Sequence, residues 1–296
     1  MAAFALPAVT LALAGLPLQA MAHGAAPGND APIGWTMTLA LLLGASGVLY
    51  AVGVRRLWRR AGARRGIRNI HLLRFVLGWL VLAGALLSPV DAFADRSFAL
   101  HMLQHELIML VAAPLFVLAR PLEAFAWALA PGMRRRVADA THLPWAKRGW
   151  RALTRQSSAW CLHAGALWIW HVPALFIAAV ANPALHVLQH ACFFGSALLF
   201  WWSVLRFRAA LQSTGAMASV LTTMLHTSAL GALLTLAAHP MYVAAGQATI
   251  LGLTALEDQQ LGGLIMWVPG SLAYLVAALV IAAGWLAPGR TRHDIA

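Results

Sequence analysis

The stretch Ala99–Leu118, ALHMLQHELIMLVAAPLFVL, is apolar and long enough to cross a bilayer, which requires a helix of about 20 mainly apolar residues. Its first half nevertheless carries His101, Gln104, His105 and Glu106. Polar and ionisable side chains are costly inside a membrane, and where they occur they usually serve a function. The stretch therefore predicts a membrane helix with a functional site in its first half.

A second apolar segment repeats this arrangement. The sequence HVLQH at 186–190 has the form of HMLQH at 101–105, with a histidine at each end and a glutamine before the second histidine. Residues four apart lie on one face of a helix, so each segment predicts a pair of imidazoles on a shared face. The sequence alone leaves open whether the two faces meet.

The composition is that of a polytopic membrane protein. Of the 296 residues, 61% are hydrophobic and 10% charged, and the mean hydropathy is +0.74. Soluble domains are about half apolar and about a quarter charged. The two cysteines, Cys161 and Cys192, both fall in apolar segments, so no disulfide framework is indicated.

The chain divides into a leader and one membrane domain. Residues 1–22 are typical of a secretory signal peptide, because an apolar run precedes a small-x-small cleavage pattern at Ala20-Met-Ala22; an extra span is the alternative. Residues 23–296 are predicted to form an all-α bundle of about seven transmembrane helices. The longest connecting loop, 120–157, leaves no room for a separate soluble domain. The expected spans are 34–54, 70–89, 98–119, 158–180, 184–204, 216–238 and 260–285.

Basic residues gather in the segments that connect alternate spans. Of the 21 Lys and Arg residues, all but Arg96 fall on one side of the expected bundle, and such a bias marks the cytoplasmic side. This places the N-terminus outside the cell and the C-terminus in the cytoplasm. The net charge of +12 is then explained by topology and by contact with anionic lipids of the bilayer, and it does not indicate a nucleic-acid partner.

Six histidines fall in the outer half of the membrane in this orientation, including His239 at the outer end of the sixth span. At 1.5 Å per residue, His105 and His190 lie roughly 9–10 Å deep. Imidazole is the commonest metal ligand in proteins, and thioether sulfur selects Cu(I). The combination favours a copper site that opens outward. The candidate ligands are His101, His105, His171, His186 and His190, with Met266 as an additional thioether.

Other functions are compatible with the same residues. Two facing histidines could hold a haem as axial ligands, as in a membrane electron-transfer protein. A proton relay through the histidines and Glu106 is a second alternative. A copper transporter is a third, since Cys161, His163 and His226 extend the polar line toward the cytoplasm. An assembly scaffold without any metal is a fourth.

Two prolines and one acidic motif lie near the expected site. Pro173 follows His171 and removes a helix hydrogen bond, so it predicts a bend or an end in that span. Pro269 can do the same in the seventh span. The motif Glu257-Asp258-Gln259-Gln260 stands at the start of that span. We expect its acids to cap the helix, with attraction of a cation as the alternative.

Three stretches together resemble a known family. They are HMLQHELIMLVAAPLFVLARPLEAFAWAL (101–129), the pieces WIWHVPALFIAAV and ALHVLQHACFFGSALLFWW within 168–202, and GLTALEDQQLGGLIMWVPGSLAYLVAAL (252–279). They are similar to the polytopic cytochrome c oxidase assembly factor family of the CtaG type, over most of the chain after about residue 35. The resemblance implies a multi-pass protein of the bacterial inner membrane that helps to mature a haem–copper oxidase through its copper centres.

The resemblance and the histidines together suggest a path for copper. We expect copper to arrive from an extracytoplasmic copper chaperone, to be held by the membrane histidines, and to pass to a cytochrome c oxidase subunit. No catalytic turnover is expected, because the chain shows no nucleophile–base arrangement, phosphate loop or ATP motif.

Overall fold

The structure is a computed structural model that describes residues 33–87, 93–94, 96–206, 214–242 and 251–286. Every regular element in these ranges is a helix, so the predicted all-α class is confirmed. The predicted signal peptide at 1–22 lies outside the described residues.

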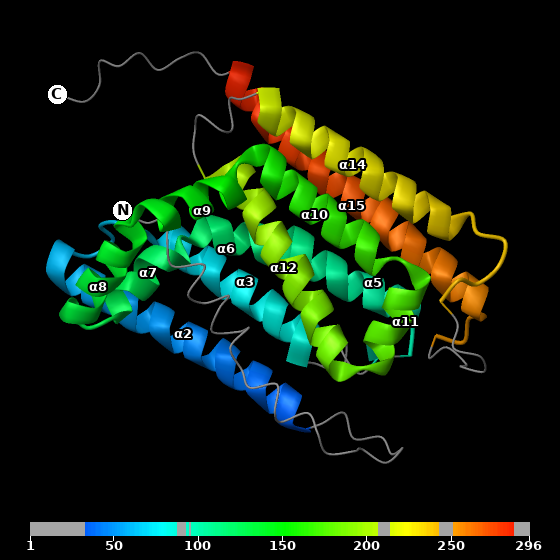
Figure 1. The fold of residues 1–296 in the computed structure, drawn as a ribbon, viewed down its shortest axis with the longest axis horizontal. Helices are drawn as coiled ribbons and strands as arrows, with labels where there is room; N and C mark the ends of the chain where they lie inside the picture. Colours follow the sequence, from blue (N-terminus) through cyan, green and yellow to red (C-terminus); the bar gives the residue numbers. More distant parts are fainter. Residues whose placement is uncertain (1–32, 88–92, 95, 207–213, 243–250, 287–296) are drawn as a thin grey trace. The chain divides into compact units, whose positions relative to one another are not determined.

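Within the described ranges, six helical stretches are long and apolar enough to cross a membrane (Figure 1). A bent pair of helices makes a seventh span if the pair is counted as one, which agrees with the predicted bundle of about seven. The orientation of the termini stays a prediction. The six stretches are α2 (Ile33–Ala61), α3 (Asn69–Leu87), Phe98–Ala119, α12 (Pro183–Leu205), α14 (Thr214–Thr235) and α15 (Ala255–Leu286), and the bent pair is α10 (Gln156–Trp170) with α11 (Pro173–Ala181).

The helices form two compact units. The first joins the chain up to Asp91 with Val111–Leu153, and the second joins Ala92–Leu110 with the chain from Thr154 onward. The stretch Ala99–Leu118 therefore contributes its histidine-bearing half to the second unit.

An aromatic core holds the first unit together. Tyr50 of α2 stacks on Phe75 of α3 with ring centroids 3.7 Å apart. Its hydroxyl donates a hydrogen bond of 3.1 Å to the carbonyl of Ala119, at the end of α6 (Ala113–Ala119). The helix α7 (Pro121–Ala128) packs along α2, so α2 joins the other helices of this unit.

The long connection between the third and fourth spans is helical, although a loop was expected there. The helices α8 (Pro131–His142) and α9 (Pro144–Thr154) each begin with a proline, which suits the first turn because an N–H there has no helical partner. On α9, Lys147 and Arg151 share a face, being four residues apart, while Trp145 is 72% exposed. This pattern is typical of helices that lie at a membrane surface.

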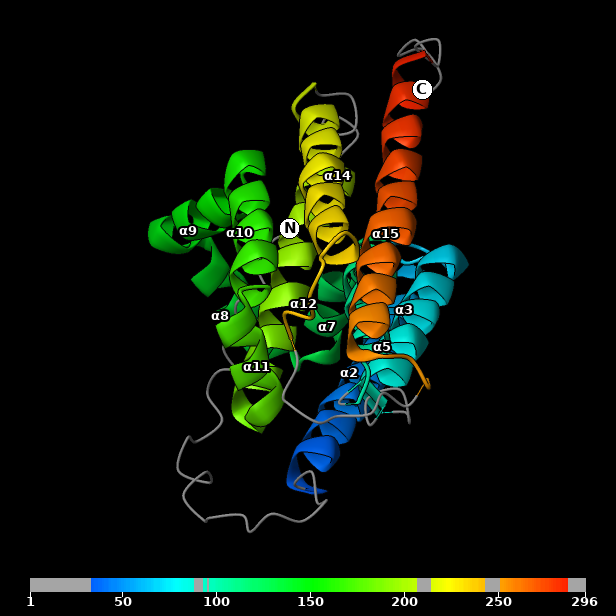
Figure 2. The same ribbon diagram turned by 90° about the vertical axis from the view of Figure 1, so that its right-hand side faces the viewer.

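In the second unit, α14 and α15 lie side by side (Figures 1 and 2). They meet at two glycines, since a Cβ on Gly263 would lie 2.7 Å from the carbonyl oxygen of Gly231. The hydroxyls of Ser228 and Ser271 hydrogen-bond between the same two helices at 2.7 Å. Small residues allow membrane helices to approach closely enough for such contacts.

Another face of α15 packs against α5 (Phe98–Glu106). Phe98 and Met102 fill the space beside Gly262, where a Cβ would overlap the Phe98 ring. The helix α10 packs on α12 and α14, and α11 packs on α12. These contacts bring α5, α12 and the junction of α10 and α11 into one unit.

Pro173 ends its helix as predicted. The helix α10 stops at Trp170 and α11 starts at Pro173, with 77° between their axes. His171 occupies the junction, with φ −92° and ψ 2°. Pro269 lies inside α15, which continues from Ala255 to Leu286 as one helix, so the chain does not break at that proline.

Candidate metal centre

The start of α5 is held by a buried carboxylate from α15. Asp258, only 3% exposed, accepts a hydrogen bond from the hydroxyl of Ser97 at 2.7 Å. It also accepts from the backbone N–H groups of Phe98 at 2.6 Å and Ala99 at 3.4 Å. The first N–H groups of a helix have no partner within it. These contacts therefore fix where α5 begins and where His101 lies, one turn later.

One acid of the motif 257–260 therefore caps a different helix from the one expected. Glu257 does cap its own helix, since Thr254 donates to it from its backbone N–H and from its hydroxyl, both at 2.8 Å. Asp258 caps α5 instead. Gln259 accepts from the N–H of Met241 at 2.5 Å. The motif joins the start of α15 to α5 and to the chain that follows α14.

Past His105 the helix widens into a π-helical turn, η2 (Leu107–Ala112). In an i→i+5 ladder the carbonyl of Met109 faces residue 114, but Pro114 has no N–H to donate. The indole N–H of Trp201 on α12 donates to that carbonyl instead, at 2.9 Å. Such turns are frequent at functional sites, and this hydrogen bond ties α12 to the histidine-bearing helix.

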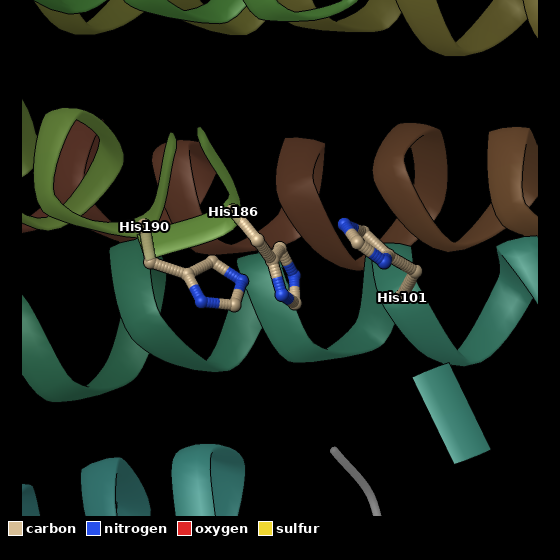
Figure 3. Close-up of side chains that lie close together, drawn as sticks. All are labelled: His101, His186 and His190. Carbon is tan, nitrogen blue, oxygen red and sulfur yellow. The ribbon is translucent and has the colours of Figure 1, made fainter. Parts of the chain in front are cut away.

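Three histidines from two helices converge in the second unit (Figure 3). One ring nitrogen each of His101 on α5 and of His186 and His190 on α12 lie within 4.8 Å of one another. His101 is 1% exposed, and the other two are partly buried. The ring centroids are 5.2 Å apart for His101–His186, 6.1 Å for His101–His190 and 4.3 Å for His186–His190. The histidine faces of the two HxLQH segments therefore meet.

His105 lies one helical turn beyond His101 and is also buried, at 1% exposure. Its ring centroid is 4.4 Å from that of His101 and 5.2 Å from that of His190. Phe193 packs on its other side at 4.5 Å. Neither ring nitrogen of His105 has a hydrogen-bond partner among the described residues.

His171, at the junction of α10 and α11, uses one ring nitrogen and leaves the other unpaired. Its Nδ1–H donates to the carbonyl of Leu167 at 2.7 Å, and its own carbonyl accepts from the hydroxyl of Tyr242 at 2.7 Å. Burial raises the pKa of Tyr242 to about 12, so this donor stays protonated at neutral pH. Nε2 of His171 has no hydrogen-bond partner in the described part of the chain. An imidazole oriented through Nδ1 in this way commonly binds metal through Nε2.

Met266 has the surroundings of a core side chain. It is 2% exposed. Its neighbours in the buried apolar cluster are Met102, Phe176, Leu230 and Leu234. Its role as a ligand stays a prediction.

Glu106 faces α15 rather than α12. A Cβ on Gly270 would lie 3.3 Å from its Oε2 atom, and that oxygen has no hydrogen-bond partner within the described ranges. Because both nitrogens of His105 are unpaired there as well, no hydrogen bond joins His105 to Glu106. A proton relay between them therefore lacks its connection in the described residues.

The converging histidines have the chemistry of a metal site. Nitrogens that bind one tetrahedral ion at about 2 Å lie about 3.3 Å apart, so modest side-chain rotations would bring nitrogens now within 4.8 Å to that spacing. Imidazole suits copper, zinc, iron and nickel. Three protein ligands leave a fourth position open for exchange, which is what a site that passes its metal onward requires.

Asp258→Ala is expected to loosen the first turn of α5 and to weaken metal binding. The change removes the acceptor of three donors at a helix start, and loss of a cap costs about 0.5–2 kcal/mol. Groups that orient metal ligands typically change affinity by about 10–100-fold when they are removed. Amide hydrogen exchange at Phe98–Leu100 and copper titration of the purified protein measure the two effects.

Glu257→Ala is the matched control for Asp258, because it removes the neighbouring acid, which caps only its own helix. It should leave the copper affinity unchanged. Asp258→Asn keeps one acceptor oxygen and should fall between wild type and Asp258→Ala. Equal copper affinities for Asp258→Ala and Glu257→Ala would show that Asp258 does not position His101.

Residues 48–287 match the model of a family described as cytochrome c oxidase caa3 assembly factor. No curated protein and no solved structure matches the chain.

Proposed function

The chain belongs to the cytochrome c oxidase caa3 assembly factor family, and from this premise we propose that it binds copper and hands it over during oxidase assembly. Family membership assigns the protein to oxidase assembly, and its apolar helices make it a membrane protein. The copper step and its ligands are the proposal. The first ligands are His101, His186 and His190.

The observation that carries this proposal is the convergence of three imidazole nitrogens within 4.8 Å. They come from two separate helices, and His101 is almost fully buried. Buried polar groups normally have hydrogen-bond partners, whereas neighbouring His105 has none on either nitrogen in the described residues. Converging imidazoles with an unpaired neighbour of this kind are suited to a metal cargo. Among the metals that imidazole binds, copper is the one that a haem–copper oxidase must receive.

The route of the copper follows from the predicted orientation. In that orientation the histidines lie toward the outer end of their helices, so the proposed donor is an extracytoplasmic copper chaperone. The proposed acceptor is a cytochrome c oxidase subunit in the same bacterial inner membrane. The protein in this role binds and releases an ion without catalytic turnover.

Haem is the other group that facing histidines could hold. A haem with two axial histidines needs a slot for a flat macrocycle between the two rings. His101 instead has the rings of His105 at 4.4 Å and Phe176 at 4.9 Å, both in edge contacts. These contacts favour an ion held by several rings. A strong Soret band in the purified protein, without copper, would require haem in place of copper.

His186→Ala is expected to weaken copper binding by the purified protein by about tenfold, the lower end of the loss caused by removing a group that only supports a ligand. In cells whose sole copy of the protein carries the change, the copper content and activity of the oxidase should fall together. Titration against a chromophoric Cu(I) chelator and elemental analysis of the isolated oxidase measure these effects.

His226→Ala provides the matched control. His226 is also a membrane histidine, but it contacts Trp160 and Trp168 on α10. Its replacement should leave copper affinity and oxidase copper intact. Normal oxidase copper in cells with His186→Ala, at normal protein levels, would contradict the handover and favour a metal-free scaffold.

Transport across the bilayer would need unpaired polar groups between the histidine cluster and the predicted cytoplasmic side. His163 lies nearer the predicted cytoplasmic side. Its two ring nitrogens form hydrogen bonds with the hydroxyls of Ser196 at 3.2 Å and Tyr274 at 3.3 Å, so both nitrogens are already used. This favours handover at one face. Copper uptake into sealed vesicles that contain the purified protein would instead support transport.

A further inference from the structure

The two HxLQH segments arrange four histidines as two parallel pairs between α5 and α12. The ring centroids are 5.2 Å apart for His101–His186 and again 5.2 Å apart for His105–His190. Successive rings on one helix are 4.4 Å apart on α5 and 4.3 Å apart on α12. An ion beside the first pair therefore has a second pair of imidazoles one helical turn away.

A third imidazole, that of His171, packs on the same phenylalanine ring as His105. His105 and His171 both pack on the ring of Phe193, with centroids 4.5 Å and 6.0 Å away. Both side chains are at most 5% exposed. Nε2 of His171 and both nitrogens of His105 have no hydrogen-bond partner in the part of the chain that is described. Unpaired polar atoms are rare at such depth, so His105 and His171 each have a nitrogen available to bind an ion.

We propose that the five histidines form two successive copper positions that share His190. The outer position adds His101 and His186, and the inner position adds His105 and His171. This inference rests on the proposed copper function and gives it a direction. Exchange of two ligands around His190 would move the ion one turn along α5 and α12, from the predicted outer surface toward the membrane interior.

A single ion occupies one position at a time in this scheme. Two cations about one turn apart repel strongly where the dielectric constant is low, so the second position is a destination rather than a second store. Each position has three imidazoles, so neither holds the ion far more tightly than the other. Near-equal affinities are what a relay requires, because a much tighter position would trap the ion.

Removing either position alone is expected to leave one bound Cu(I) per chain. The pair variant His101→Ala/His186→Ala keeps the three inner ligands, and His105→Ala/His171→Ala keeps the three outer ones. Each should bind one Cu(I) with an affinity about tenfold below wild type, the lower end of the range for changes outside the ligand set, because the remaining position keeps all three of its ligands. Anaerobic titration measures the stoichiometry and affinity. X-ray absorption at the copper edge should report about three imidazole nitrogens in both variants, the number of protein ligands that open metal sites commonly have.

Other outcomes would overturn the inner position without touching the proposed function. If His101→Ala/His186→Ala bound no copper while His105→Ala/His171→Ala bound it as wild type does, only the outer position would exist. If both pair variants lost all copper, the five histidines would form one indivisible site. Failure of the wild-type protein to bind copper would instead overturn the proposed function itself. Glutamine at the same positions, which keeps a polar side chain of similar size, repeats the test where an alanine variant does not fold.

Discussion

His190→Ala should have the largest effect of any single histidine change, with copper affinity falling by more than about 100-fold, beyond the range seen for supporting groups. His190 is the one side chain that belongs to both proposed positions. Its ring lies 4.3 Å from His186, 5.2 Å from His105 and 6.1 Å from His101. Its loss leaves two imidazoles at each position, whereas any other single change leaves one position with three.

Single changes at the histidines that belong to one position only should have smaller effects than His190→Ala. His101→Ala and His105→Ala each damage one position, so the copper moves to the other and the affinity should fall by less. The oxidase in cells with His190→Ala should contain background copper, as measured by elemental analysis. His190→Cys supplies a thiolate, which binds Cu(I) well, and should recover part of the binding. Similar affinities for all three alanine variants would contradict a shared ligand.

Sequence pattern was sufficient for the membrane helices and for the two histidine pairs that meet. The i, i+4 spacing in HxLQH put each histidine pair on one face, and the structure brings the faces of α5 and α12 together at His101, His186 and His190. Pro173 marked the junction that holds His171. These features could be predicted because they depend on local periodicity and on the missing N–H of proline.

The supports of the site could not be predicted from local pattern. Asp258 caps a helix that begins 160 residues earlier in the chain, and helix capping was predicted for it only on its own helix. The π-helical turn after Glu106 depends on Trp201 reaching the carbonyl of Met109. Such pairings are set by tertiary packing, and one sequence contains no signal for them. The acidic motif and Pro114 mark the places of the cap and of the Trp201 hydrogen bond, but neither names the partner.

The two supports together explain how a buried histidine cluster keeps its shape. Asp258 fixes the first turn of α5, and Trp201 fixes the turn that follows it. The nine residues of α5 are thus tied to α15 at one end and to α12 at the other. A short helix held at both ends keeps His101 and His105 in register with His186 and His190.

Gly263→Ala should destabilise the second unit by about 1–3 kcal/mol or more, the range for a side chain added to a filled interior. Its Cβ would lie 2.5 Å from the hydroxyl oxygen of Thr235 and 2.7 Å from the carbonyl oxygen of Gly231. Gly231 presents backbone there, so rotation of a side chain cannot relieve the overlap and α14 must move away from α15. Thermal unfolding in detergent, followed by circular dichroism, measures the loss.

Gly284→Ala separates this packing effect from helix propensity. Both glycines lie in α15, but a Cβ on Gly284 meets nothing within 4 Å. Alanine is preferred over glycine in a helix by about 1 kcal/mol, so Gly284→Ala should be neutral or stabilising while Gly263→Ala is destabilising. Movement of α14 away from α15 should also disturb the candidate metal centre. Leu230 and Leu234 of α14 pack in one buried cluster with Met102 and Met266, and Met102 is next to His101 on α5. If both variants unfolded at the wild-type temperature, close contact between the two helices at Gly263 would not be what holds them together.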